Sequence, residues 1–151
     1  MDAYDHPLLA DLPEPLGSYD AYIESWVWRG QFKRAFAEVF RAPERNVCFR
    51  ISDWVDDHAP IAMAYRFARR KYSMKVNFRL PSNYPFVPKA FELAHRLNSA
   101  LAFDVGQKVG DTGCLILTPE GHIKAGKLIE YGRERYDGSR PLRIIPYNTD
   151  N

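Results

Sequence analysis

The stretch from Tyr72 to Leu80, YSMKVNFRL, alternates between apolar and polar side chains. Successive side chains of a strand point to opposite faces, so this alternation predicts a strand with one face in a core and the other in water. Half-buried strands of this kind are typical of antiparallel sheets. Tyr72 and Phe78 fall on the same side as Met74 and Val76, so we expect the basic side of this strand to carry no aromatic ring.

Three segments favour helices. In one of them, apolar side chains recur at helical spacing from Phe32 to Phe40. This helix should end before Pro43, because a residue that precedes proline avoids helical dihedrals. A shorter helix is expected just before it, over Tyr22–Trp28. The third helix is expected from Pro88 to Ala102, with the proline at a first helical position.

Further strands are expected at Asn46–Val55, Phe103–Val105, Cys114–Thr118 and Leu142–Pro146. The segment Ile61–Arg70 fits either a helix or a strand, and His122–Tyr136 fits a strand followed by a helix. Helices interspersed with half-buried strands predict an α+β fold. We expect an antiparallel or mixed sheet with helices packed on one face, in a single compact domain.

The acidic residues are unevenly distributed along the 151-residue chain, whose formal net charge is only +2. Residues 1–25 contain six acidic residues and no Lys or Arg, so the remainder is clearly basic. We therefore expect an acidic, proline-containing leader at 1–25 packed on a domain at 26–147, followed by a tail at 148–151. The leader either covers a basic surface of its own domain or is a displaceable arm that competes with an acidic ligand.

Cys48 and Cys114 both lie in apolar runs of strand type, which suits small core hydrophobes in a reducing cytoplasm. The N-terminal residues have no basic stretch followed by an apolar core, so no secretory signal is expected. No apolar run approaches the roughly 18 residues of a membrane span. The sequence predicts a cytoplasmic protein.

The glycine-rich stretch Gly106–Gly113, GQKVGDTG, invites comparison with a phosphate-binding loop. A phosphate loop needs a helix N-terminus directly after it, whereas the residues that follow here are of strand type. Asp111 also has the wrong sign for a phosphate. We interpret the stretch as a connection between two strands and expect no cofactor.

An acidic cluster with one tryptophan follows the first expected strand. It comprises Asp53, Trp54, Asp56, Asp57 and His58. The spacing matches neither a calcium loop nor a zinc pair, so we expect no metal. Exposed acids beside an aromatic ring suit docking onto a basic partner, and this cluster is our predicted partner-binding site.

A basic segment follows further along the chain. Its cationic residues are Arg66, Arg69, Arg70, Lys71, Lys75 and Arg79. Basic strands can hold nucleic acid through phosphate contacts, but a solvated strand face explains the same charges. Catalytic signals are weaker still, because the histidines are scattered and no nucleophile motif occurs.

The span from Ala90 to Lys124 runs from the helix AFELAHRLNSAL into the strand FDV, a polar loop and then CLILTPEGHI. This arrangement resembles small bacterial immunity proteins, which neutralise toxins of polymorphic or contact-dependent systems. The resemblance implies no enzyme activity, one cognate toxin as partner, and an interface rich in aromatic and charged residues. It carries over no specific functional residue.

The leading hypothesis is therefore a non-catalytic, immunity-type inhibitor that binds its toxin directly, with the acidic cluster mimicking a nucleic-acid substrate. The first alternative is a nucleic-acid-associated module that uses the segment from Arg66 to Arg79. The second alternative is a small enzyme whose site is assembled only in the fold.

Overall fold

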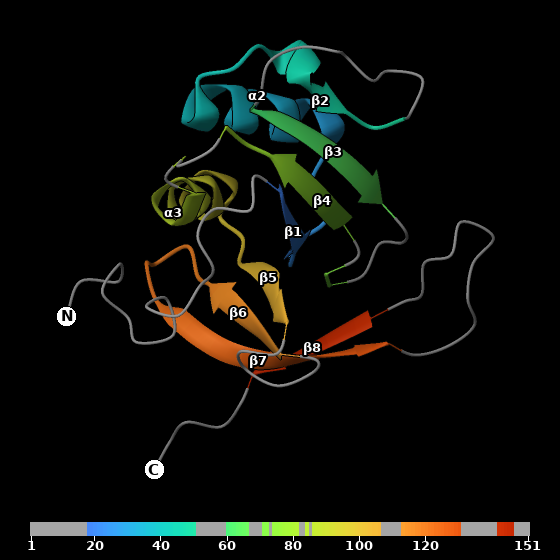
Figure 1. The fold of residues 1–151 in the computed structure, drawn as a ribbon, viewed down its shortest axis with the longest axis vertical. Coiled ribbons are helices and arrows are strands. Elements are labelled where there is room, and N and C mark those ends of the chain that lie inside the picture. The colour runs from blue at the N-terminus through green and yellow to red at the C-terminus, as the bar shows by residue number, and fades with distance from the viewer. Residues whose placement is uncertain are drawn as a thin grey trace.

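The computed structural model describes residues 18–50, 60–66, 71–72, 74–81, 84, 86–106, 113–130 and 142–146. These residues form one mixed sheet of eight strands with two α-helices, which confirms the predicted α+β class (Figure 1). The helices are α2 (Arg29–Phe40) and α3 (Phe86–Leu97), with a short 3-10 helix η2 (Glu44–Asn46). The strands are β1 (Ser18–Ile23), β2 (Val47–Cys48), β3 (Ile61–Arg66), β4 (Met74–Arg79), β5 (Leu101–Gly106), β6 (Gly113–Leu117), β7 (Ile123–Glu130) and β8 (Leu142–Pro146).

The strands lie in the order β2-β3-β4-β1-β5-β6-β7-β8, and all neighbours are antiparallel except β2 and β3. The first strand in the sequence is thus an inner strand: Ala21 pairs with Val76 of β4 on one side and with Phe103 of β5 on the other. The helix expected over Tyr22–Trp28 was wrong, because pairing on both sides outweighs the weak local preference of this segment. The last part of the expected leader, residues 18–25, includes this inner strand, whereas residues 1–17 lie outside the described residues.

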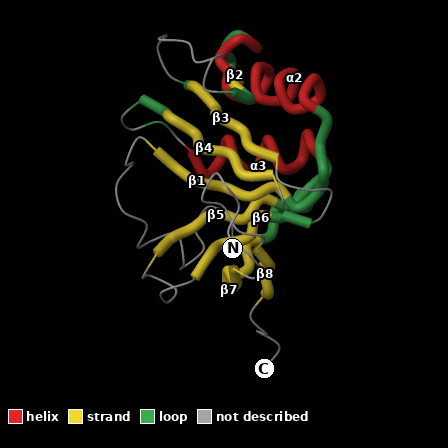
Figure 2. Tube along the Cα trace, turned by 90° about the vertical axis from the view of Figure 1, so that its right-hand side faces the viewer, coloured by secondary structure: helices red, strands yellow, loops and turns green. Residues whose placement is uncertain are grey.

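Both helices pack against the same face of the sheet, and Figure 2, which looks onto the strands, shows α3 behind them. Their apolar side chains meet those of the sheet in one large core. Stacked aromatic rings form its centre, and Phe78 of β4 lies 5.6 Å from Phe40 of α2 and 5.6 Å from Phe86 of α3 between ring centroids. Aromatic pairs at these distances add about 0.5–1.5 kcal/mol beyond their burial. The predicted helix layer on one face is therefore confirmed.

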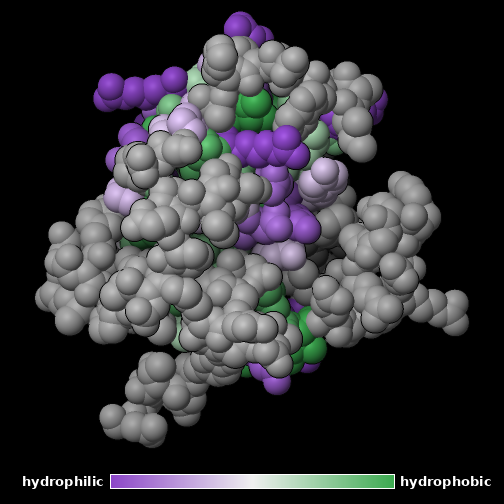
Figure 3. Space-filling view, viewed as in Figure 1, coloured by the Kyte–Doolittle hydropathy of each residue, from purple (hydrophilic) through white to green (hydrophobic). Residues whose placement is uncertain are grey.

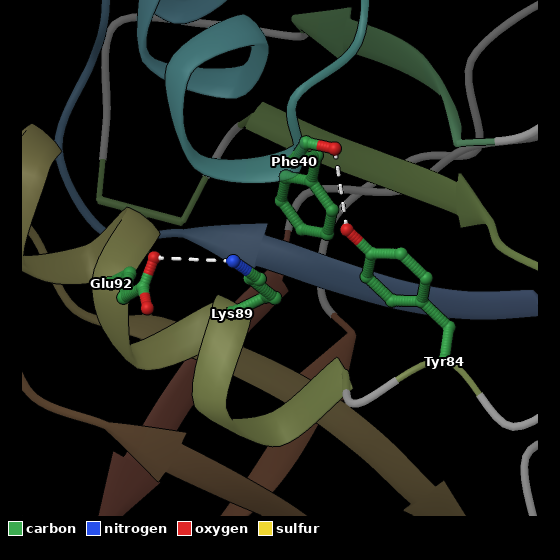
Figure 4. Close-up of polar contacts among 4 residues, drawn as sticks. All are labelled: Phe40, Tyr84, Lys89 and Glu92. Atoms are coloured by element: carbon green, nitrogen blue, oxygen red, sulfur yellow. Dashed lines mark hydrogen bonds and ion pairs between the residues drawn. The ribbon is translucent and has the colours of Figure 1, made fainter.

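A polar contact at the rim ties the loop before α3 to the end of α2 (Figure 4). The phenol of Tyr84 donates a hydrogen bond of 3.3 Å to the carbonyl oxygen of Phe40. Within α3, Lys89 and Glu92 form an ion pair of 3.7 Å. Because these side chains are partly solvated, the ion pair adds little stability.

The first predicted core helix is confirmed, since Phe32, Phe36 and Phe40 of α2 are all buried. The helix ends where Arg41 adopts a left-handed conformation (φ 53°), two residues before Pro43. The helix expected over Pro88–Ala102 is α3, but it begins at Phe86, so Pro88 is its third residue and not its first. It is also shorter than expected, because Asn98 is left-handed (φ 50°) and ends it after Leu97. Leu101 then begins β5, which starts two residues earlier than the predicted Phe103.

The alternation of β4 is confirmed, with Met74, Val76 and Phe78 buried in the core. Tyr72 was wrongly placed on that side. It precedes the strand in a turn, adopts a left-handed conformation (φ 58°), and packs in a second apolar cluster. This cluster lies on the outer face of the sheet, opposite the helices, and its buried members are Tyr72, Ala100, Ala102, Cys114 and Ile116.

The remaining strand predictions have mixed outcomes. Of the strand expected at Asn46–Val55, only Val47–Cys48 is observed, and residues 51–59 lie outside the described part of the chain. The ambiguous segment after it contains β3, and His122 is followed directly by β7. The last strand, Leu142–Pro146, is confirmed. Cys48 and Cys114 are both buried thiols, as expected of small core hydrophobes.

Candidate functional site

The acidic cluster predicted as a partner-binding site lies outside the described residues. All of its members fall within residues 51–59: Asp53, Trp54, Asp56, Asp57 and His58. The described chain ends just before it, at Phe49 and the exposed Arg50. The cluster therefore stays a prediction.

The basic segment is only partly described. Arg69 and Arg70 lie outside the described residues, and of Arg66 only the backbone is described, paired with Met74. Lys71 is exposed in the turn before β4. Lys75 and Arg79 both lie on the outer face of β4, away from the helices.

Aromatic rings do lie on this basic face, contrary to our expectation. Tyr65 of β3 and Tyr22 of β1 stand directly opposite Lys75 in the register of the sheet, one on each side of it. In the next row Asn77 donates a hydrogen bond of 2.8 Å to the carboxylate of Asp20. The expectation failed because these tyrosines come from neighbouring strands, which the alternation of one strand does not reveal. Figure 3 shows hydrophilic side chains near the centre of the view, where β4 lies in Figure 1.

A second surface is formed where the chain enters α2. Trp28 occupies the N-cap position of α2 and is 64% exposed, the highest value among the large hydrophobic side chains that the structure describes. Its ring contacts Trp26 edge-to-face, with 4.5 Å between centroids. Val27, between the two, is buried, so the extended chain sends the two indoles outward and anchors itself through the valine.

Cationic side chains follow Trp28 in the first turns of α2 and lie over another ring, that of Phe49. The guanidinium of Arg29 lies 5.1 Å from the ring centroid of Phe49, and the ammonium of Lys33 lies 5.9 Å from the same centroid. Both contacts are within cation–π range. We call the side chains of Trp28, Arg29, Lys33, Phe49 and Arg50 the Trp28 surface.

Sequence reasoning missed this surface because it assigned Trp28 to a helix. A signal was present: Trp26 and Trp28 flank Val27 at a spacing of two, in a segment with no acidic neighbour after Glu24. In an extended segment that spacing places both indoles on one side.

A buried polar contact links the two halves of the sheet on the outer face. The N–H of Tyr72 donates to the carbonyl of Glu24 (3.0 Å), and the N–H of Glu24 donates to the carbonyl of Ala100 (2.9 Å). Burial, and then the negative charge of Glu24, raise the pKa of the Tyr72 phenol well above its usual range, and a side-chain hydrogen bond with Glu24 acts in the same direction. Tyr72 is thus a neutral hydrogen-bonding group, and its role here is structural.

The other shifted group is remote from Tyr72. Burial is the main cause of the raised pKa of Tyr84, which packs against the main core on the helix side. The described residues contain no group of three or more His, Cys, Asp or Glu side chains placed to hold a metal ion. The two shifted tyrosines therefore do not bring an acid and a base together.

The glycine-rich stretch connects paired strands, as its sequence indicated. Gly106 at the end of β5 pairs with Gly113 at the start of β6, and residues 107–112 lie outside the described residues. A strand, rather than a helix, follows the stretch. The helix N-terminus that a phosphate loop requires is therefore absent at this place in the described chain.

The described residues form an α+β domain with one helix-covered sheet face and an exposed tryptophan at the start of α2. Comparison with protein-family models, with curated proteins and with solved structures finds no match. Neither described helix combines the length and the apolar character needed to cross a membrane.

Proposed function

We propose that this chain is a non-catalytic protein-binding protein of the immunity type, which neutralises a cognate bacterial toxin by direct binding. The observation that carries the proposal is the 64% exposure of Trp28 beside Trp26. The arrangement between Ala90 and Lys124 that resembles immunity proteins supports the kind of partner.

The physical support comes from the cost of leaving an indole in water. Tryptophan buries roughly 150–250 Å² when it is covered, and Trp, Tyr and Arg are the residues enriched in the centres of protein interfaces. Trp28 is held by its edge-to-face contact with Trp26, so it loses little conformational freedom on binding. Arg29, the residue after Trp28, also belongs to a residue type that is enriched in the centres of protein interfaces.

The variant Trp28→Ser tests this proposal without endangering the fold. Trp28 is an N-cap with extended dihedrals (φ −66°, ψ 148°) and no side-chain cap hydrogen bond. Serine at this position can accept a hydrogen bond from the first turn, which stabilises a helix by about 0.5–2 kcal/mol. This gain offsets the roughly 0.5–1.5 kcal/mol lost with the indole pair. We expect the free energy of unfolding to change by no more than about 1 kcal/mol.

The binding partner to test first is the product of the gene next to the one that encodes this chain. We expect co-expression of this chain to protect cells from that product, and Trp28→Ser to weaken the purified complex by at least about thirtyfold. Ile145→Ser is the matched control, because Ile145 is also exposed (44%) but lies on the edge strand β8. Equal affinity of Trp28→Ser and the unaltered chain would refute the role of the surface, and absence of any complex would refute the immunity assignment.

The acidic cluster remains a second proposed contact in the same function. Substituting Asp56 and Asp57 by alanine tests it in the same assay. Intact affinity in that double variant would remove the cluster from the interface and leave Trp28 unaffected.

A second candidate function is the binding of single-stranded nucleic acid on the outer face. The specific observation is the row Tyr65–Lys75–Tyr22, which places a cation between two aromatic rings. Bases stack on such rings while cations contact the phosphates. Asp20 on the same face opposes this use, which is why we rank it second.

Binding of a fluorescent oligo(dT) probe at low salt tests the candidate. If it holds, affinity falls steeply as salt rises, and Tyr65→Ala removes a stacking contact of about 1–3 kcal/mol. No retention of the probe at low salt would dispose of this function.

A further inference from the structure

We propose that the Trp28 surface receives an acidic protein partner, one that presents several Asp or Glu side chains around an apolar slot for the indole of Trp28. This inference rests on the proposed function and adds the chemistry of the partner to it. It is carried by the exposure of Trp28, by the positive charges that follow it in α2, and by the contacts of Arg29 and Lys33 with Phe49.

The charged side chains that the structure describes on the Trp28 surface are all positive: Arg29, Lys33 and Arg50. From Ser25 to Ala37 the sequence contains Arg29, Lys33 and Arg34 but no acidic residue, and the first turn of α2 has no acidic side chain. Arg29 and Arg34 are exposed, as is Arg50 next to Phe49.

The first acidic residue of α2 forms an ion pair with a residue outside the Trp28 surface. Glu38 pairs with Arg96 of α3 at 2.6 Å. It therefore neutralises a cation of α3 rather than one of the Trp28 surface.

Two of the cations are also held close together. Arg29 and Lys33 are one helical turn apart, and both lie over the ring of Phe49. Like charges at this spacing repel each other and destabilise a helix by a few tenths of a kcal/mol. A carboxylate bound between them would relieve the repulsion.

The geometry suits a carboxylate better than a diffuse negative field. A guanidinium stacked on a ring keeps its N–H groups available for a bidentate hydrogen bond with a carboxylate. Because Phe49 already orients Arg29, less conformational entropy is lost when the partner binds. The exposed indole of Trp28, which directly precedes Arg29 in the chain, supplies the apolar anchor.

The sign of the partner is opposite to the one that the acidic cluster predicted. Asp53, Asp56 and Asp57 favour a basic toxin, whereas the Trp28 surface favours an acidic one. An assay that compares partners of both signs separates the two expectations.

The first experiment uses peptides as probes, so that it does not depend on an identified toxin. One peptide carries glutamates around a pair of leucines, and the other has lysines in place of the glutamates. We expect the glutamate peptide alone to shift the tryptophan emission of the protein, with an affinity that falls as salt rises. The shift should be lost in Trp28→Ser.

Charge reversal then tests the cations. The double variant Arg29→Glu, Lys33→Glu should bind the glutamate peptide at least about tenfold more weakly. The matched control is Lys124→Glu, Lys127→Glu, which changes the net charge equally at two exposed positions of β7 and should bind normally. Equal losses in both double variants would overturn the inference, because only the overall charge would then matter.

The remaining outcomes separate this inference from the proposed function. If the neighbouring gene product binds through Trp28 while the lysine peptide outcompetes the glutamate peptide, the acidic partner is wrong and the proposed function stands. If the glutamate peptide binds as expected but no toxin is neutralised, the proposed function fails alone. Binding of oligo(dT) that depends on Trp28 would also overturn the inference, because the surface would then serve a nucleic acid.

Discussion

Tyr72 combines a backbone in the left-handed region with a buried phenol. A residue other than glycine at φ 58° is held in a conformation that it rarely adopts, and the hydrogen bond from its N–H to Glu24 holds it there. Its ring packs with Cys114 in the second apolar cluster. This single residue therefore joins the turn before β4 to the outer face of β5 and β6.

The raised pKa of Tyr72 gives a prediction for alkaline pH. In the unfolded chain the phenol titrates near pH 10, whereas in the folded protein it holds its proton to higher pH. Its contribution to stability is complete below about pH 10 and is lost as the pH rises from there toward the folded-state pKa. We expect the melting temperature of the unaltered protein to fall steeply above pH 10.

Tyr72→Phe should make that fall shallower, although it lowers stability at neutral pH by removing the hydrogen bond with Glu24. Melting curves between about pH 8 and pH 11 measure both effects. Tyr65→Phe is the control, since Tyr65 is 38% exposed. Identical slopes for Tyr72→Phe and the unaltered protein would contradict the assignment.

At the scale of elements, β6, β7 and β8 approach each other closely at Gly126. A Cβ atom at this position would lie 2.9 Å from Cδ1 of Ile116, 3.1 Å from the carbonyl oxygen of Ile145 and 3.2 Å from Sγ of Cys114. The glycine thus lets the buried Ile116 lie across β7.

Gly126→Ala should destabilise the protein by about 1–3 kcal/mol, the range expected for an overpacked site. Ile116→Val removes the closest atom and by itself costs about 0.5–1.5 kcal/mol. We expect the double variant to lose less than the two single losses combined, as measured by urea denaturation. Additive losses would show that the carbonyl of Ile145, rather than Ile116, sets the limit.

The two core helices could be predicted because their burial follows a local period, as Phe32, Phe36 and Leu93 illustrate. The identity of β1 could not, because Ala21 owes its conformation to partners far away in sequence. The tyrosines beside Lys75 could not be predicted for the same reason, because they come from strands that are distant in sequence. The exposure of Trp28 was also hidden, since it depends on the chain leaving β1 in an extended conformation.

At the scale of the whole molecule, the inner strands of the sheet have more pairing and packing partners than the outer strands. β1 is paired on both sides, and its neighbour β4 carries Phe78 of the aromatic core. Among the strands that the structure describes, β8 has β7 as its single neighbour. Local stability should therefore decrease from β1 toward β8.

Native-state hydrogen exchange measures this gradient. We expect the amides of β1 that pair with β4 to exchange only through global unfolding, so that their free energy of opening follows denaturant with the full slope. Amides of β8 should open locally, with a lower free energy and a smaller dependence on denaturant. Equal protection in β1 and β8 would show that the sheet opens as one unit.

Because β1 is an inner strand but comes first in the sequence, it is synthesised before both strands with which it pairs. This strand leaves the ribosome well before its neighbours, yet Tyr22 must pair with Lys75 and Ala102. Pairing between such distant residues is slow, and until β5 emerges β1 lacks one of its two neighbours. A nascent chain that ends before Phe103 therefore holds an incomplete sheet, and this is the period in which we expect it to depend on chaperones.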